Sequence, residues 1–165
     1  MTIMGTSEKR REHVRQATAD DAAGILDCLR LAFEPYGDRY SPEAFADTTL
    51  TPETLRARMA AMTILVAVSP SGEIAGTIAF AMVGEQEGHL RGMAVRPEWQ
   101  AQGTADRLLS AAEAELRPRN CRRITLDTTA PLERAVRFYE SRGYRRSGTV
   151  GDFFGMPLFE YAKEL

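Results

Sequence analysis

The sequence predicts a single domain of the α/β (α+β) class, with a mixed central sheet and helices on both of its faces. Its 165 residues suit one domain of ordinary size. The expected order is a strand, two helical regions and three consecutive strands, followed by a helix, a strand, a helix and two strands. This order predicts a mixed sheet with helices packed on each face. No repeat or long linker divides the chain.

The elements of the amino-terminal part follow from charge and hydrophobic spacing. Residues 1–12 are polar and charged and are expected to form a flexible leader, so the domain itself is expected over 13–165. A short strand covers 13–18. Apolar residues at helical spacing then predict a helix that ends at Phe33. A second helical region is expected over 42–61, with an interruption where Leu50 precedes Thr51 and Pro52.

The carboxy-terminal part shows a change of period from strand to helix and back. A turn rich in Pro, Ser and Gly separates the first two of three successive strands. The final helix is expected to end at Gly143, which suits the position after a helix terminus. The expected strands are 63–69, 74–83, 89–95, 123–128, 144–150 and 157–163, and the expected helices run from about 105 to 116 and from 132 to 142.

Composition excludes several classes of protein. A net charge of −2 argues against a surface that coats nucleic acid. The two cysteines, Cys28 and Cys121, form no CxxC pair, so neither a zinc site nor any other metal site is expected. There is no apolar signal segment and no apolar run of about 18 residues. We therefore expect a cytoplasmic protein that does not associate with membranes.

The most informative segment is the turn that follows the strand ending at Val95. It places the small residues Gly103 and Ala105 at the expected start of a helix. A helix start presents unpaired N–H groups and the positive end of the helix dipole, which suits a pyrophosphate. Neither GxGxxG nor a P-loop is present. The alternative is a plain strand–turn–helix unit in which the small residues only ease packing.

Two motifs together resemble the GNAT superfamily of N-acetyltransferases. Gln100, Gly103 and Ala105 match the coenzyme A signature Q/R-x-x-G-x-G/A. About thirty residues later, 135–144 match the segment A-x-x-F-Y-x-x-x-G-F/Y. The resemblance covers roughly 13–165 and implies acetyl-CoA as co-substrate. Leu132 departs from the family pattern, because many relatives carry an Asn there that reaches the coenzyme.

The resemblance also implies roles for particular residues. The strand ending at Val95 should splay from its neighbour, which frees N–H groups to polarise the acetyl carbonyl. Tyr139 would protonate the departing thiolate, although its helical face also suits a core position. The main chain of the strand end would pair with the pantetheine arm, and the amides of the turn would hold the pyrophosphate. These main-chain positions are Met93, Ala94 and Val95 in the strand, and Ala101, Gln102, Gly103, Thr104 and Ala105 in the turn.

The base that removes the amine proton is expected on the same strand. His89 stands where many relatives have an acidic residue, and strand alternation would put it on one face with Arg91, Met93 and Val95, barring a bulge. An imidazole titrates near neutral pH. Glu87 is the second candidate, and a surface histidine without a catalytic role is the alternative.

These features predict an N-acetyltransferase that acts by direct transfer to a primary amine of a small molecule or peptide. A non-catalytic acyl-CoA sensor with the same fold is one alternative, and O-acyl transfer or a longer acyl donor is another. A homodimer is compatible with the family. Acceptor specificity is expected in two segments, 33–45, with the aromatic residues Phe33, Tyr36, Tyr40 and Phe45, and the tail loop 151–157. Acidic residues in these segments, such as Glu34, Asp38 and Asp152, would attract a cationic amine.

Overall fold

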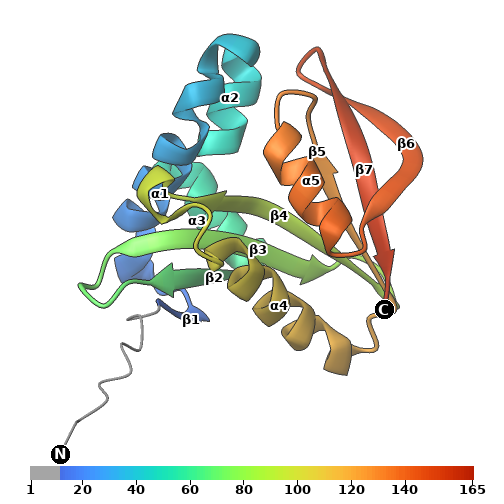
Figure 1. The fold of residues 1–165 in the computed structure, drawn as a ribbon, viewed down its shortest axis with the longest axis horizontal. Coiled ribbons are helices and arrows are strands. Elements are labelled where there is room, and N and C mark those ends of the chain that lie inside the picture. The colour runs from blue at the N-terminus through green and yellow to red at the C-terminus, as the bar shows by residue number, and fades with distance from the viewer. Residues whose placement is uncertain (1–11) are drawn as a thin grey trace, which may run out of the picture.

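The structure is a computed structural model that describes residues 12–165 (Figure 1). Apart from Glu12, the expected leader therefore lies outside the described residues. Within this part of the chain, no helix has the length and apolarity that a membrane span requires. The helices are α1 (Ala22–Phe33), α2 (Pro42–Thr49), α3 (Pro52–Ala61), α4 (Thr104–Leu116) and α5 (Glu133–Ser141). The strands are β1 (His13–Gln16), β2 (Thr63–Val68), β3 (Ile74–Met82), β4 (Glu87–Val95), β5 (Arg123–Thr128), β6 (Arg145–Phe153) and β7 (Met156–Glu164).

The seven strands form one mixed sheet, which confirms the predicted fold class. Their order across the sheet is β1-β2-β3-β4-β5-β7-β6. Only β4 and β5 are parallel, and α4 makes the crossover connection between them. The helices occupy both faces, because α1 and α3 pack on β2 to β4 from one side and α4 packs on the same strands from the other.

Two hydrophobic clusters fill the layers between the sheet and its helices. One cluster joins α4 and α5 to the sheet and contains Leu108, Leu109 and Tyr139. The other joins α1 and α3 to the opposite face and contains Ile25, Leu29 and Leu55. The periodic apolar residues that predicted α1 and α4 are the ones that these clusters bury.

The parallel strands β4 and β5 pair over only part of their length. Their register runs from Glu87 opposite Arg123 to Leu90 opposite Leu126 and then stops. In Figure 1, β5, β6 and β7 turn away from the plane of β1 to β4, and α5 lies at the point of divergence. The expected splay of the strand that ends at Val95 is therefore present.

A β-bulge interrupts β4 where the strands begin to diverge. The register against β3 shifts between Thr77 and Ala79, and Gly92 has a φ of +63°. As a result, Leu90 and Met93 both pack in the α4–α5 cluster, whereas Ala94 packs in the cluster on the other face. The alternation from His89 to Val95, expected only in the absence of a bulge, does not hold, because the extra residue of a bulge reverses the direction of the side chains that follow.

The prediction of a tail loop over 151–157 is wrong. Strand β6 continues to Phe153 and β7 begins at Met156, so the connection is a tight hairpin. Phe154 and Gly155 have φ values of +50° and +88°. Two successive residues with positive φ match the right-handed twist of the flanking strands, which makes a longer loop unnecessary.

Candidate active site

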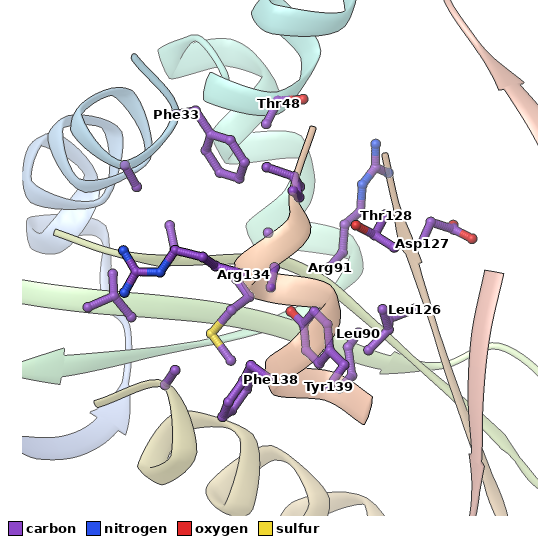
Figure 2. A pocket seen from close by; sticks show the side chains of 18 of the residues that line it. Phe33, Thr48, Leu90, Arg91, Leu126, Asp127, Thr128, Arg134, Phe138 and Tyr139 are labelled. Atoms are coloured by element: carbon purple, nitrogen blue, oxygen red, sulfur yellow. The ribbon is translucent and has the colours of Figure 1, made fainter. Parts of the chain in front are cut away.

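A cleft of about 710 Å³ opens where β4 leaves β5 (Figure 2). Its volume is within the range of small-molecule and cofactor sites. One wall is formed by α4 and α5, and the other by α1, α2 and α3. Most of the residues singled out from the sequence line this cleft: His89, Met93, Ala94, Val95, Gln100, Ala101, Gly103, Thr104, Ala105 and Tyr139. Gln102 and Glu87 do not line it.

The free edge of β4 is one polar surface of the cleft. Because pairing with β5 stops at Leu90, the stretch from Arg91 to Val95 has no strand beside it on that side. Backbone N–H and C=O groups on this edge need another partner. An extended ligand with amide groups, such as the pantetheine arm of coenzyme A, fits this requirement.

The turn before α4 forms a second polar surface. Ala101 and Gly103 have φ values of +60° and +83°, and α4 begins at Thr104. The Arg107 amide donates to the carbonyl of Gly103, so the amides that precede it have no partner inside the helix. The side-chain amide of Gln100 donates to the Val95 carbonyl at 3.1 Å and fixes the turn against the end of β4. The result is a helix start with unpaired amides, a geometry that suits an anion, and it adjoins the free strand edge.

Charged side chains surround this turn. Arg107 and Arg134 were considered from the sequence as partners of the coenzyme phosphates, whereas Glu12 was not singled out. The buried carboxylate of Glu12 accepts hydrogen bonds from the Thr104 hydroxyl and from the guanidinium of Arg107. Arg142 donates to Asp106 at 2.5 Å. Arg134 also lines the cleft. No local motif marks Glu12 as part of the turn, because it lies more than ninety positions away in the chain.

Tyr139 lies at the floor of the cleft on α5 (Figure 2). It is 7% exposed, and its ring packs edge-on against Tyr144 with 5.9 Å between centroids. Burial alone raises the pKa of its hydroxyl, which therefore stays protonated at neutral pH. The residue thus combines the two properties foreseen from the sequence, since it belongs to the core and also faces the cleft.

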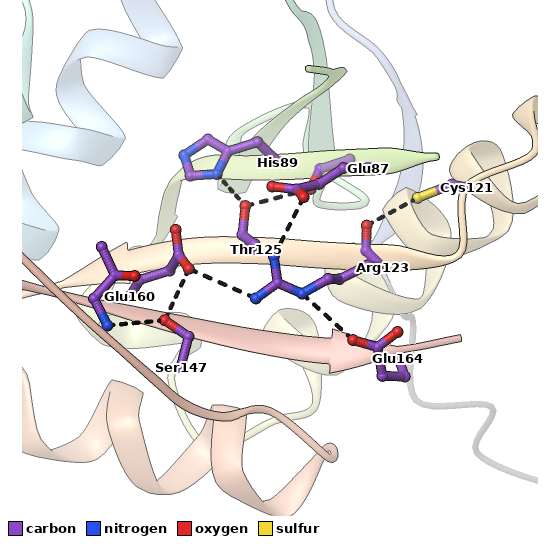
Figure 3. Close-up of polar contacts among 10 residues, drawn as sticks. Glu87, His89, Cys121, Arg123, Thr125, Ser147, Glu160 and Glu164 are labelled. Atoms are coloured by element: carbon purple, nitrogen blue, oxygen red, sulfur yellow. Dashed lines mark hydrogen bonds and ion pairs between the residues drawn. The ribbon is translucent and has the colours of Figure 1, made fainter. Parts of the chain in front are cut away.

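His89 lines the cleft and has polar partners from β5. Its Nδ1 is 2.8 Å from Oγ1 of Thr125, and its Nε2 is 3.5 Å from Oδ2 of Asp127 (Figure 3 shows the Thr125 contact). Burial lowers the pKa of His89 and raises the pKa of Asp127, because it disfavours both charged forms. Neither Thr125 nor Asp127 was singled out from the sequence. The only available signal was the polar alternation of Arg123, Thr125 and Asp127 along an expected strand.

Glu87, the second candidate base, is held away from the cleft. Its carboxylate pairs with Arg123 at 3.2 Å, and Arg123 also contacts Glu160 and Glu164 (Figure 3). The structure therefore separates the two candidates, because His89 faces the cleft and Glu87 belongs to a surface network of charges.

The wall of the cleft formed by α1, α2 and α3 is aromatic. Phe33, Tyr36 and Tyr40, expected as acceptor-site residues, line it. The Tyr40 hydroxyl is 2.5 Å from Oγ1 of Thr129, which joins the segment after α1 to the end of β5. The acidic residues that line the cleft are Asp47, Asp106 and Asp127, rather than Glu34, Asp38 or Asp152, which were considered from the sequence.

Comparison with known proteins identifies acetyltransferases as relatives of this chain. Residues 25–144 match the acetyltransferase (GNAT) family. The chain is 30% identical over 156 residues to an aminoglycoside N(6')-acetyltransferase type 1 of Stenotrophomonas maltophilia, covering 88% of this chain and 93% of that protein.

Solved structures share the fold at lower identity. The PaiA N-acetyltransferase of Thermoplasma acidophilum in complex with coenzyme A has a TM-score of 0.77 and 18% identity, covering 93% of this chain and 98% of its own. The ribosomal-protein-S18-alanine N-acetyltransferase of Escherichia coli has a TM-score of 0.74 and 18% identity, covering 93% of each chain.

Proposed function

This chain belongs to the acetyltransferase (GNAT) family, and from that premise we propose that it moves an acetyl group from acetyl-CoA to a primary amine of a small molecule. The transfer is direct, within a ternary complex. The observation that carries the proposal is a single cleft that joins the free edge of β4, the turn from Gln100 to Ala105, Tyr139 and His89. Acetyl-CoA supplies an activated thioester, and the residues of this chain bind it, polarise its carbonyl and move the protons.

The coenzyme is held mainly by main chain in this proposal. The amides of 101–105 bind the pyrophosphate, and the free edge of β4 from Met93 to Val95 pairs with the pantetheine amides. An N–H group of the same edge polarises the acetyl carbonyl, where negative charge develops during the reaction. Leu132 supports a main-chain mode of binding, because it lines the cleft with an apolar side chain at the position of the relatives' Asn.

Proton removal is assigned to His89, with support from Thr125 and Asp127. If Nδ1–H donates to Oγ1 of Thr125, the lone pair of Nε2 is left free in the cleft. The incoming amine then lies beside Nε2 and the Asp127 carboxylate, and the carboxylate stabilises the imidazolium that forms. Burial favours the neutral imidazole, which is the form that accepts a proton.

Tyr139 is assigned to protonate the departing thiolate. Its raised pKa keeps the proton on the hydroxyl until a strong base appears beside it. A covalent acyl-cysteine is not part of the proposal. Cys28 is fully buried, and burial raises the pKa of its thiol to about 12, while Cys121 is buried outside the cleft.

The relative from Stenotrophomonas maltophilia supports a small-molecule amine as acceptor, since it is named for an aminoglycoside. A sensor that binds acetyl-CoA without chemistry is not favoured, because Tyr139 and the His89–Asp127 pair both face the cleft.

The proposal is tested by thermal unfolding with and without acetyl-CoA, followed by thiol release against a panel of amines that includes an aminoglycoside. Acetyl-CoA at 100 times its Kd should stabilise the protein by about 2.7 kcal/mol. The His89→Ala variant should keep this stabilisation and lose turnover. An absent thermal shift would contradict the coenzyme site, and a shift without thiol release on any amine would contradict the transferase.

A further inference from the structure

Arg58 occupies an unusual place in the cleft, on the wall formed by α1, α2 and α3. It projects from α3, is half-buried and lines the cavity. Its guanidinium lies directly against the bulge of β4, since a Cβ atom built on Gly92 would be 2.7 Å from Nη1 of Arg58. Arg58 therefore stands where β4 leaves β5, beside the free strand edge.

The charges around Arg58 do not balance. The negative charge of Asp47 stabilises the Arg58 cation from a distance. The Asp47 carboxylate, however, forms its ion pair with Arg91, whose Nη2 lies 3.0 Å from Oδ2 of Asp47. Within residues 12–165, no side chain forms an ion pair or a hydrogen bond with the Arg58 guanidinium. Burial and then the charge of Arg91 lower the pKa of Arg58 to about 10, so the group stays cationic at neutral pH.

A desolvated cation without an anion is costly, and proteins normally compensate for it with a paired carboxylate or a ligand. Arg58 has a planar fork of donors that suits a carboxylate in two-point contact. The turn from Gln100 to Ala105, at the start of α4, already provides for the coenzyme pyrophosphate. The anion that matches Arg58 is then on the acceptor.

We propose that Arg58 binds a carboxylate of the acceptor, so that the substrate class is an amine that also carries a carboxylate. This inference rests on the proposed acetyl transfer and narrows its acceptor. His89 and Asp127 face the amine end, and Arg58 faces the carboxylate end. Gly92 follows His89 by three positions, roughly 10 Å along an extended strand. An acceptor that reaches both ends needs several bonds between its amine and its carboxylate, as the side-chain amine of lysine provides.

The test compares amines in matched pairs that differ by the carboxylate. Lysine and cadaverine form such a pair, as do ornithine and putrescine, and a polycationic aminoglycoside is the third kind of acceptor. Thiol release from acetyl-CoA gives kcat/KM for each. The wild-type enzyme should prefer the carboxylate-bearing member, and Arg58→Gln should lower its kcat/KM by about 10- to 100-fold with little change for the decarboxylated partner. Arg58→Lys should retain part of the preference.

Arg56→Gln is the matched control, because Arg56 lies on the same helix with a side chain that is 74% exposed. Thermal unfolding with acetyl-CoA shows whether each variant is folded and binds coenzyme. Equal kcat/KM within every pair, or preference for the aminoglycoside, would overturn the inference and leave acetyl transfer intact. Weaker stabilisation of Arg58→Gln by acetyl-CoA would also overturn it, because the anion would then be a coenzyme phosphate.

If no amine releases thiol, acetyl transfer itself fails and the carboxylate site is still testable. Calorimetric titration of lysine and of cadaverine into the protein saturated with coenzyme A then measures whether the carboxylate of lysine contributes to binding. Binding of lysine that Arg58→Gln abolishes supports the site, and equal or absent binding of the two compounds overturns it.

Discussion

Nε2 of His89 lies 3.5 Å from Oδ2 of Asp127, and the two side chains come from the neighbouring strands β4 and β5. His89 directly precedes Leu90, and Asp127 directly follows Leu126, which together form the last paired position of the two strands. The pair therefore stands at the point where the edge of β4 becomes free. One feature of the sheet therefore brings together the proposed proton acceptor, His89, and the proposed oxyanion donor, the free edge of β4.

Asp127→Asn should shift the pH dependence of turnover. Burial is the largest effect on the pKa of His89 and lowers it, whereas the Asp127 charge raises it. Loss of that charge lowers the pKa further, so the acidic limb of kcat/KM should move to lower pH. The weaker base should also reduce the maximum by about tenfold or more. A pH–rate profile measures both effects.

Glu160→Gln is the control for this variant. It removes a carboxylate that has a smaller effect on His89 and makes no contact with the ring. Its profile should move much less than that of Asp127→Asn. An Asp127→Asn profile identical to wild type would show that the pair takes no part in proton removal.

Tyr139→Phe should lower kcat by about 10² or more, because the departing thiolate loses its acid. Thermal stabilisation by acetyl-CoA should persist, since coenzyme binding is assigned to main chain. The raised pKa of Tyr139 contributes nothing to the free energy of unfolding at neutral pH, because the hydroxyl is protonated in both the folded and the unfolded state. Single-turnover kinetics with saturating acetyl-CoA measure the effect, and an unchanged rate would leave Tyr139 as a core residue only.

The neighbouring Tyr144→Phe separates catalysis from stability. The Tyr144 hydroxyl donates to Oε1 of buried Glu113 at 2.9 Å, and Lys163 contacts the same carboxylate at 3.1 Å. Loss of one partner should cost about 1 to 2 kcal/mol in the free energy of unfolding. Turnover should stay near wild type at temperatures where the variant is folded. Urea denaturation and a parallel activity assay distinguish the two tyrosines.

The element order and the turn from Gln100 to Ala105 could be predicted from the sequence, because both depend on residues that are close together in the chain. The spacing of apolar residues predicts α1 and α4, and the sequence Leu50, Thr51 and Pro52 predicts the break between α2 and α3. The turn before α4 depends on small residues that are close together in the chain, so a short motif describes it. Tyr139 is likewise fixed by its position in a local segment.

The places of Asp127 and Arg58 in the cleft were not accessible from the sequence, because they depend on contacts between distant segments. Asp127 becomes relevant only through the parallel register that places β5 beside β4. Arg58 lies on a helix whose apolar pattern is weak, and only the packing of α3 against the bulge at Gly92 brings it into the cleft. Registers and bulges are set by the whole sheet, and the local sequence carries little information about them.

Ala101→Gly should stabilise the free protein. Ala101 has a φ of +60°, a region that costs a residue with a Cβ atom about 1 to 2 kcal/mol, and part of this is offset by the flexibility of glycine in the unfolded chain. We expect a gain of about 0.5 to 1 kcal/mol in the free energy of unfolding. Ala105→Gly makes the same change inside the first turn of α4 and should instead lose about 0.5 to 1 kcal/mol. Chemical denaturation of both variants checks the opposite signs.

Asp21→Asn should remove an acid-sensitive part of the stability. Arg15 donates two hydrogen bonds to the Asp21 carboxylate, at 2.7 and 2.9 Å, and lowers the pKa of Asp21 to about 2. A carboxyl with a lowered pKa stabilises the folded state above its unfolded pKa of 3.8, and this contribution disappears as the pH falls toward 2. Since Arg15 is partly exposed, we expect a loss of about 1 kcal/mol at pH 7.

Denaturation at a series of pH values compares Asp21→Asn with wild type and with Asp20→Asn, which alters an exposed neighbour that makes no such contact. The wild-type and Asp21→Asn curves should lie apart at neutral pH and converge between pH 4 and pH 2, because protonation then removes from the wild type what the substitution has already removed. Asp20→Asn should follow the wild type throughout. A constant separation at all pH values would mean that the Arg15–Asp21 pair contributes through packing and not through charge.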